Sequence, residues 1–347
     1  METSPQCVNN TASLSVFHET PLLSLSQDKI SNDAHDKDTS PDKMYLGARE
    51  SHTFAFHGAG FTDIRHYQYW DSERARLAIP QWLQDMENAP EHSIIVLHIA
   101  AHWPSATDPT PAEWKEIAEV MKRKNLFPFF FVTSLGLASG DLHKDAFPVR
   151  HFVTERFELF CAQSFSKNFG LYNQRVGSLT FVSRDNQSLV RIRSQLAAAA
   201  MSTWGNPPNM GAHIVVTILN NPAFFTEWQH SIRNMARRLM LTREKLSEEL
   251  RTLGTPRPLN YISRQIGLYV FADFTDSEIE YLKKRRHIHL TSIGQINMSL
   301  INNQNLPYVA RCINEAVQAA GEHPASAQAT QPSLLAALPV SQILSLQ

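Results

Sequence analysis

The sequence predicts an α/β fold, in which a mostly parallel sheet covered by helices forms a larger domain followed by a smaller one. From residue 50 onward, strand patterns alternate with helix patterns, which is typical of a parallel sheet with helices on its faces. Ser93–Ala100 and Leu126–Val132 are nearly continuous apolar runs, as expected of strands buried on both faces. A helix pattern from Phe224 to Leu253 stops at Gly254 and is long enough to join two domains.

Each further element has its own local signal. Thr110, Pro111 and Glu113 form a capping box with proline at the first helical position, so a helix begins there. Pro128 has no backbone N–H, so its strand should lie at an edge of the sheet or begin near this residue. We also expect helices over 51–57, 79–87, 186–204 and 276–286 and from 305, and strands over 62–69, 157–163, 178–182, 267–274, 288–293 and 295–300.

The composition is that of an ordinary globular protein and excludes several classes. Of the 347 residues, 43% are hydrophobic and 19% are charged, and the net charge is −1, which argues against a nucleic acid or membrane partner recognised by bulk charge. Three cysteines give no disulfide framework, and no apolar run is long enough to span a membrane. We expect a cytoplasmic protein with no metal site, whose polar ends, 1–12 and 322–347, are disordered.

The segment Ser164–Gly177, SFSKNFGLYNQRVG, carries the chemistry. Lys167 follows an apolar strand pattern, where partial desolvation would lower its pKa and make its amine a nucleophile toward carbonyls. Ser164, Ser166 and Arg175 can supply hydroxyl donors and a guanidinium for a phosphate. Together they suit pyridoxal phosphate, an aldehyde that carries a phosphate. A Ser-x-x-Lys pattern by itself is more often a surface turn with a solvated lysine.

The full string closely resembles the lysine segment of the aspartate aminotransferases, which are pyridoxal-phosphate enzymes of fold type I, and the likeness extends over roughly residues 13–320. The resemblance implies that Lys167 forms the Schiff base and that Ser164, Ser166 and Arg175 surround the phosphate. It also implies a homodimer with active sites at the subunit interface. The large cofactor-binding domain would span 49–234, and the small domain would combine 13–48, which begins with an N-terminal arm, with 235–321.

The family pattern breaks after Ala48, where the sequence passes directly to a segment that matches a much later part of the family. The resemblance implies that a large block at the start of the main domain is absent. In the family, this block carries a glycine-rich phosphate loop and a tyrosine that reaches the neighbouring subunit. The large domain is therefore expected to be truncated.

The resemblance further implies that four positions around the cofactor ring have diverged or lost a partner. Phe131 stands where the family has the acid that keeps the pyridine nitrogen protonated, and Ser134 replaces the tyrosine that contacts the ring hydroxyl. Trp103 replaces an asparagine and has one donor and a larger volume. His52, which would orient the acid, is retained.

Both substrate-binding arginines of the family are replaced as well. Gln295 stands where an arginine holds the α-carboxylate, and Met201 where a second arginine reads the other carboxylate across the dimer. Losing two charged hydrogen bonds would cost roughly 10²–10⁴ in substrate capture. Together with the segment Gly294–Asn297 and the C-terminal extension, these replacements most resemble a divergent cytoplasmic paralog of the family.

Three functions are therefore open. The chain is an aspartate aminotransferase that transfers amino groups between L-aspartate and 2-oxoglutarate, with weak or lost activity. Alternatively, it is a pseudoenzyme that acts by forming a homodimer or a heterodimer with a family subunit. The third possibility is a carrier that binds pyridoxal phosphate without turnover. The residues favour the second function over the first.

Overall fold

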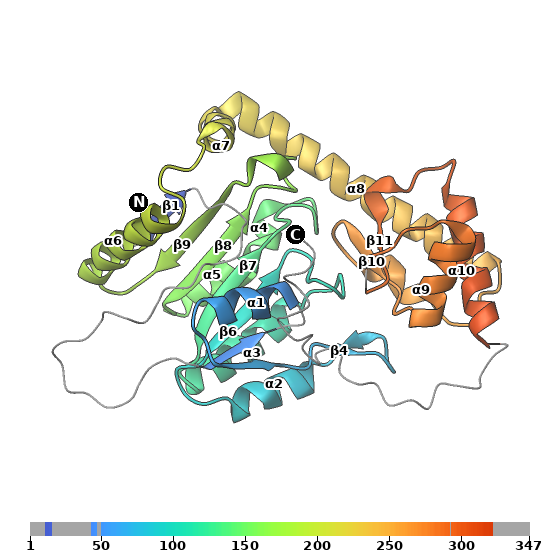
Figure 1. Ribbon diagram of the computed structural model, residues 1–347, viewed down its shortest axis with the longest axis horizontal. Helices are drawn as coiled ribbons and strands as arrows, with labels where there is room; N and C mark the ends of the chain where they lie inside the picture. Colours follow the sequence, from blue (N-terminus) through green and yellow to red (C-terminus); the bar gives the residue numbers. More distant parts are fainter. Residues whose placement is uncertain (1–10, 16–42, 47–49, 292, 322–347) are drawn as a thin grey trace, which may run out of the picture.

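A seven-stranded sheet forms the centre of the larger domain in the computed structural model, which describes residues 11–15, 43–46, 50–291 and 293–321 (Figure 1). The strand order is β1–β9–β8–β7–β6–β2–β3, and β9 runs antiparallel to both of its neighbours. The remaining neighbours from β8 to β3 are parallel, which confirms the predicted α/β class. The strands are Thr11–Ser15 (β1), Lys43–Leu46 (β2), Asp63–His66 (β3), Ile94–Ile99 (β6), Phe127–Val132 (β7), Leu159–Ser164 (β8) and Gly177–Val182 (β9).

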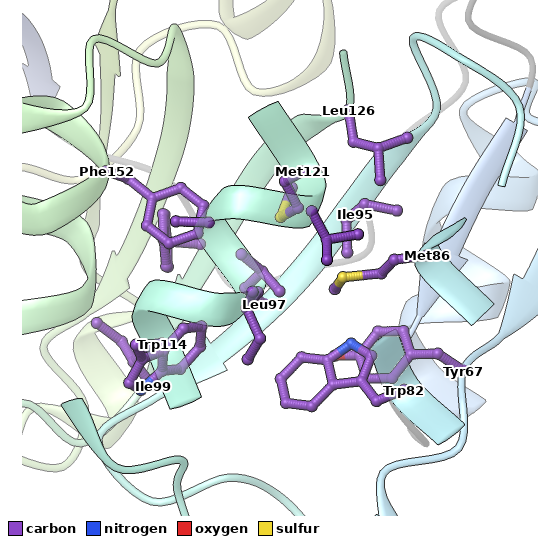
Figure 2. Close-up of a cluster of buried hydrophobic side chains, with 14 of the residues drawn as sticks. Tyr67, Trp82, Met86, Ile95, Leu97, Ile99, Trp114, Met121, Leu126 and Phe152 are labelled. Carbon is purple, nitrogen blue, oxygen red and sulfur yellow. The ribbon is translucent and has the colours of Figure 1, made fainter. Parts of the chain in front are cut away.

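One face of this sheet is covered by α2 (Ile79–Asn88), α3 (Pro111–Arg123) and α5 (Phe147–Thr154). Figure 2 shows the core between these helices and the strands, where Trp82 and Trp114 pack with Ile95 and Leu97 of β6. Buried aromatic side chains of this size dominate the apolar surface removed from water on folding. The capping box at Thr110 is present and fixes the start of α3, as predicted.

The other face is covered in part by α1 (Glu50–Gly58). Because successive strand residues point to opposite faces, Val96 and Phe129 lie on this side together with Phe56 of α1. The ring of Phe131 belongs to the same cluster. This small second core matters for function because the retained His52 is part of α1.

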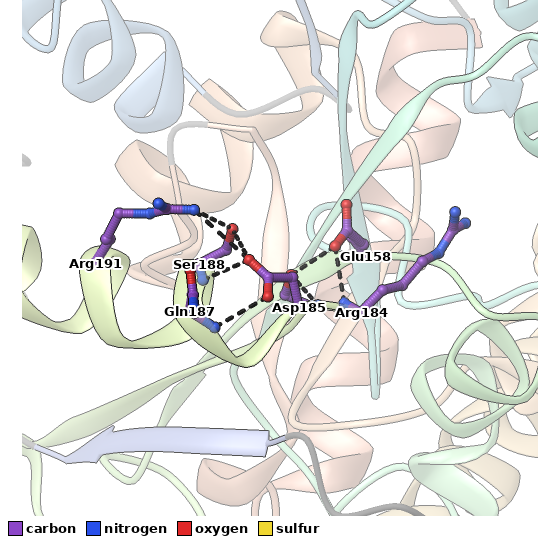
Figure 3. Close-up of polar contacts among 7 residues, drawn as sticks. Glu158, Arg184, Asp185, Gln187, Ser188 and Arg191 are labelled. Atoms are coloured by element: carbon purple, nitrogen blue, oxygen red, sulfur yellow. Dashed lines mark hydrogen bonds and ion pairs between the residues drawn. The ribbon is translucent and has the colours of Figure 1, made fainter.

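Helix α6 (Asn186–Thr203) is held mainly at its start (Figure 3). Asp185 accepts hydrogen bonds from the backbone N–H groups of Gln187 and Ser188, at 3.1 and 2.8 Å. The Ser188 hydroxyl donates to the same carboxylate at 2.7 Å, and this bond together with the two backbone bonds lowers the pKa of the Asp185 carboxyl. Glu158 accepts from the Ser183 hydroxyl at 2.6 Å and joins this turn to the strand β8 region. Leu189 is the one buried residue of the helix, so most of its length packs loosely against the domain.

The long helix α8 (Pro222–Thr252) runs from the larger domain into the smaller one, as predicted (Figure 1). Ile232 lies against the loop that follows β7, whereas Leu239, Leu246 and Leu250 belong to the core of the smaller domain. That domain also contains β10 (Tyr269–Phe271), α9 (Asp276–Arg286), β11 (Gln295–Asn297) and α10 (Leu306–Gly321). The segment 288–291 forms no strand, so the short strand predicted over 288–293 is wrong for its described part.

The N-terminal strands β1 and β2 belong to a different part of the molecule than expected. Residues 13–48 were expected to belong to the N-terminal arm and the small domain, but β1 pairs with β9, and β2 lies between β3 and β6 in the large sheet. Pro128 lies in a central strand. The prediction of an edge strand is therefore wrong, but the strand does begin near Pro128, as the alternative prediction stated. The pairing of β7 with β8 starts at Phe129, so the missing N–H of Pro128 lies before the first residue of that pairing.

Three helices were not anticipated: α4 (Leu142–Asp145), α5 and α7 (Met210–Asn220). The expected disorder of 1–10 and 322–347 and most of the expected N-terminal arm lie outside the described residues. In the part of the chain that is described, no helix is long and apolar enough to cross a membrane, and no cluster of side chains is arranged to hold a metal ion.

Candidate active site around Lys167

A cavity of about 20 Å³ lies at the carboxyl ends of β6, β7 and β8, where the smaller domain meets the sheet. This is the edge at which open α/β sheets bind their ligands. Lys167 lines it together with three of the residues that replace family positions, Trp103, Ser134 and Gln295. The other lining residues are Ala101, His102, Ala106, Thr133, Ile266, Leu268 and Tyr269.

Lys167 is positioned by hydrogen bonds of its neighbours in the turn after β8. Phe165 donates its backbone N–H to the Val176 carbonyl at 3.1 Å. The Asn168 side chain donates to the Leu135 carbonyl at 3.2 Å, and the Asn168 carbonyl accepts from the Trp228 indole at 2.9 Å. Both sides of Lys167 are thereby tied to the sheet and to α8. The lysine is half-buried at the end of a strand, as the sequence predicted.

The three expected phosphate ligands lie near Lys167 in the chain but do not line the cavity. The Ser164 hydroxyl accepts a hydrogen bond from the backbone N–H of Ser166, at 3.2 Å. Arg175 has a left-handed backbone conformation, with φ of 47°, and its guanidinium donates to the Tyr172 carbonyl at 3.4 Å. Their proposed contact with a phosphate therefore stays a prediction.

Gln295 and Trp103 both reach across the boundary between the domains. Gln295, which is 1% exposed, donates from Nε2 to the Pro104 carbonyl at 2.5 Å. The ring of Trp103 packs edge-to-face on Tyr269, with centroids 5.0 Å apart. Neither side chain presents a cation to the cavity, so a substrate carboxylate finds no guanidinium at the position of Gln295.

Phe131 does not line the cavity, and its ring contacts those of two histidines. Its ring is 4.4 Å from that of His52 and 5.4 Å from that of His98, measured between centroids. An aromatic ring thus fills the place where the resemblance puts an acid. The hydrocarbon ring can neither accept a proton from nor donate one to a ligand.

Ser134 and Met201 have different surroundings. Ser134 is buried at the cavity wall, and its hydroxyl lies 3.3 Å from that of Thr133. Met201 is 61% exposed on α6, away from the cavity. The Ser134 hydroxyl cannot reach as far toward the ring of a bound cofactor as the tyrosine of the family would.

A second layer around the cavity was missed by the sequence analysis. Asp108 accepts hydrogen bonds from the backbone N–H groups of Ala101 and His102, at 2.9 and 2.7 Å, and burial raises its pKa to about 6. The His102 ring stacks on Tyr69, with centroids 3.4 Å apart. The available signal was an aspartate four residues after Pro104, in the loop between a buried strand and the capping box of α3.

Asp145 plays a similar part in the loop that carries Ser134. It accepts from the backbone N–H groups of Gly136, Ala138 and Ser139, at 2.7, 3.2 and 3.1 Å. The Ser139 hydroxyl donates to it as well, at 2.5 Å. Burial nevertheless raises the pKa of Asp145, because desolvation outweighs these bonds.

Pyridoxal phosphate does not fit the residues that surround Lys167 in this arrangement. A cavity of about 20 Å³ has room for one or two water molecules, whereas pockets for ligands of cofactor size measure roughly 300–1,000 Å³. Trp103 and Tyr269 form an aromatic wall of this cavity. The amine is present, but the cavity beside it is too small for the cofactor, and Ser164, Ser166 and Arg175 are not among its lining residues.

Comparison with known proteins places the chain in a family. The model of the family "Aminotransferase class I and II" matches residues 50–313, beginning directly after the break at Ala48. Chicken (Gallus gallus) cytoplasmic aspartate aminotransferase is 51% identical over 268 residues, which are 77% of this chain and 65% of the relative. The bovine (Bos taurus) protein named aspartate aminotransferase, cytoplasmic 2, is 39% identical over 269 residues, which are 78% of this chain and 65% of the relative.

The fold is shared with solved aminotransferases. The aromatic-amino-acid aminotransferase from Burkholderia pseudomallei, solved with covalently bound pyridoxal phosphate, superposes with a TM-score of 0.76 at 29% identity, over 79% of this chain and 69% of that one. This likeness confirms fold type I.

The identities also correct one expectation. Identity is higher to the chicken enzyme than to the bovine cytoplasmic 2 protein, so the expected special likeness to that paralog is not supported. The chain spans about two thirds or less of the length of these curated relatives. It belongs to the class I and II aminotransferases and, within them, to the aspartate aminotransferase family, which uses pyridoxal phosphate.

Proposed function

We propose that this chain is an aspartate aminotransferase-family protein in which amino-group transfer between L-aspartate and 2-oxoglutarate is weak or lost. The observation that carries the proposal is the cavity itself. It keeps Lys167 but measures about 20 Å³, and Gln295 is the residue at the position of the α-carboxylate arginine. No arginine lines the cavity among the residues that the structure describes.

The chemistry of the replacements supports this reading. A dicarboxylate substrate gains most of its orientation from charged, bidentate hydrogen bonds, and each such bond contributes about 1.5–3 kcal/mol. The Gln295 amide nitrogen carries two N–H donors and no charge, and one of the two is already bonded to the Pro104 carbonyl. Met201 offers no hydrogen-bond donor at all. The expected loss of substrate capture is roughly 10²–10⁴.

A coupled transaminase assay with added pyridoxal phosphate tests the proposal. The purified protein should show no turnover of L-aspartate and 2-oxoglutarate above its Lys167→Ala variant, or turnover at least about a hundredfold below that of the chicken relative. Turnover equal to that of the relative would overturn it. A visible spectrum with and without the cofactor separates a non-binding protein from a carrier, since the carrier would show an imine band without turnover.

A second candidate function is assembly with another copy or with a family subunit. Several large apolar side chains on α6, α7 and the start of α8 are exposed, and few residues of α6 and α7 are buried. Because α7 packs against α8, the exposed apolar side chains of these two helices belong to neighbouring elements, and exposed apolar surface of this kind is typical of an interaction site. The side chains are Val190, Met201, Met210, Val216, Leu219 and Phe224.

Sedimentation velocity tests this second function with a matched pair of variants. Leu219→Asp places a charge on α7 and should shift a dimer toward monomer. Leu300→Asp makes the same change at a 70% exposed leucine in the smaller domain and should leave the dimer intact. A wild-type protein that sediments as a monomer, alone and with the chicken relative, would contradict assembly. A cytoplasmic location, as in the names of the relatives, belongs to the same proposal.

A further inference from the structure

Three contacts join the two domains at the cavity that Lys167 lines. From the smaller domain, Gln295 donates to the Pro104 carbonyl at 2.5 Å, and the backbone N–H of Ile266 donates to the Ala106 carbonyl at 2.7 Å. From the larger domain, Trp103 packs on Tyr269. All three contacts involve residues that line the cavity or are adjacent to such residues in the chain. The contacts between the domains therefore also form part of the cavity wall.

Gln295 is held in this contact by hydrogen bonds of both its backbone and its side chain. Its backbone N–H donates to the Thr291 hydroxyl at 3.0 Å, which fixes the start of β11. Because Nε2 must face a carbonyl, the orientation of the amide is determined, and Oε1 has no hydrogen-bond partner among the described residues. The bond from Gln295 Nε2 to the Pro104 carbonyl is thus the bond that this buried amide makes across the domain boundary, and it contributes to holding the two domains together.

The seam behind this contact is tightly packed. Gly267 has φ of 82°, and a Cβ at this position would lie 2.2 Å from the Cβ of Ala101, so the Ala101 methyl group packs directly against the Gly267 backbone. On its other side, the buried guanidinium of Arg243 on α8 donates to the Gly267 carbonyl. The segment 266–268 is therefore fixed to the smaller domain while it presses on the larger one.

We propose that Gln295 and Trp103 form an interdomain latch that holds the cavity closed beside Lys167, so that full access to the lysine requires the domains to separate. The two residues stand at positions where the family resemblance puts substrate- and cofactor-binding groups, yet here both contact the opposite domain. The latch closes the site without any ligand. It does not depend on whether the chain transaminates, because it concerns access to an amine.

Reductive methylation of the full-length protein with formaldehyde and cyanoborohydride tests the latch. Methylation of Lys167 is measured by peptide mass spectrometry relative to Lys144, an exposed lysine on α4. Gln295→Glu at pH 8 keeps the shape but replaces the donor with a carboxylate facing the Pro104 carbonyl. The Lys167/Lys144 ratio should rise about five- to tenfold, the factor expected from losing one hydrogen bond.

Gln265→Glu is the matched control. Gln265 is also buried, but its Nε2 donates to the Phe271 carbonyl at 2.7 Å, within the smaller domain. This variant should leave the ratio unchanged. An unchanged ratio in Gln295→Glu, or an equal rise in Gln265→Glu, would overturn the latch.

A second variant covers a failure to fold. Gln295→Asn keeps an amide but is one methylene too short to reach Pro104, and it should raise the ratio in the same direction. Small-angle X-ray scattering should then show a larger radius of gyration for both Gln295 variants and an unchanged one for Gln265→Glu. A radius that stays constant while the Gln295 variants remain folded counts against the proposal.

Discussion

The ring of Phe131 packs edge-on against the imidazole of His52, with centroids 4.4 Å apart. In the aspartate aminotransferase pattern, an acid at this position would face the same histidine. In this chain, Phe131 instead packs against the apolar cluster that contains Phe56 and Val96. A site with Phe131 at this position offers no negative charge to a bound aromatic nitrogen.

Restoring the acid should therefore restore affinity for pyridoxal phosphate, provided that space is made for the ring. The variant Phe131→Asp/Trp103→Asn should bind the cofactor about 10–100-fold more tightly than Phe129→Asp/Trp103→Asn, as expected from one charged hydrogen bond. Both variants lose a phenylalanine of the same cluster, but only the first places the carboxylate beside His52. Absorbance titration measures the affinity, and equal affinities would refute the role of position 131.

Asp108 should make stability fall as the pH rises from about 4 to 6. Its folded pKa of about 6 lies above the unfolded value, so the folded state holds the proton more tightly, and ionisation at higher pH costs stability. Between these pH values, the wild type should lose at most about 3 kcal/mol relative to Asp108→Asn. Urea unfolding of both proteins at pH 4, 5, 6 and 7 measures the difference, which should level off above pH 6. A difference that does not change with pH would show that Asp108 stays ionised.

Gly267→Ala should push the two domains apart. The new Cβ would lie 2.2 Å from the Cβ of Ala101, and the residue would also have to keep φ of 82°. We expect a loss of about 2–4 kcal/mol in the free energy of unfolding, from overpacking together with left-handed backbone strain. The double variant Gly267→Ala/Ala101→Gly removes the clash but leaves the strain at position 267, and it is compared with Ala101→Gly alone because residue 101 also has a positive φ, of 77°. It should recover about half of the loss in urea melts, and no recovery would mean that the clash contributes little.

Asp145 should contribute strongly to the free energy of unfolding because it holds the loop 136–139. Asp145→Ala leaves three backbone N–H groups of the loop 136–139 without their acceptor, which should cost about 2–4 kcal/mol in chemical denaturation. Asp145→Asn keeps one acceptor oxygen and should cost less. A loss below about 1 kcal/mol for the alanine variant would indicate that water replaces the carboxylate.

Local signals predicted the individual elements well. The capping box at Thr110 and the helix Asp276–Arg286 were anticipated from neighbouring residues, and the buried strands β6 and β7 from their apolar runs. The helix α7 was missed because its apolar residues surround much of the helix and leave no clear polar face. The places of β1 and β2 in the sheet depend on pairing with residues far away in the chain, which no local pattern encodes.

The same division applies to the site. The position of Lys167 at the end of a strand was predicted from the sequence. The resemblance identified Trp103, Ser134 and Gln295 as replaced positions, and all three line the same cavity as Lys167. What these side chains do instead could not be anticipated. The bond from Gln295 to Pro104 joins residues 191 positions apart, and it exists only because the fold brings two domains into contact.

Helix α8 is a long, continuous connection between the two domains. Its 31 residues form one unbroken rod about 46 Å long, whose first turns lie beside α7 and whose last turns lie inside the smaller domain. A tilt of about 5° at the near end would move the far end by about 4 Å, more than the length of the hydrogen bond that Gln295 makes. If α8 moves as a rigid body, a small displacement where it contacts α7 would therefore become a larger displacement of the smaller domain, which supplies Gln295 to the wall of the cavity.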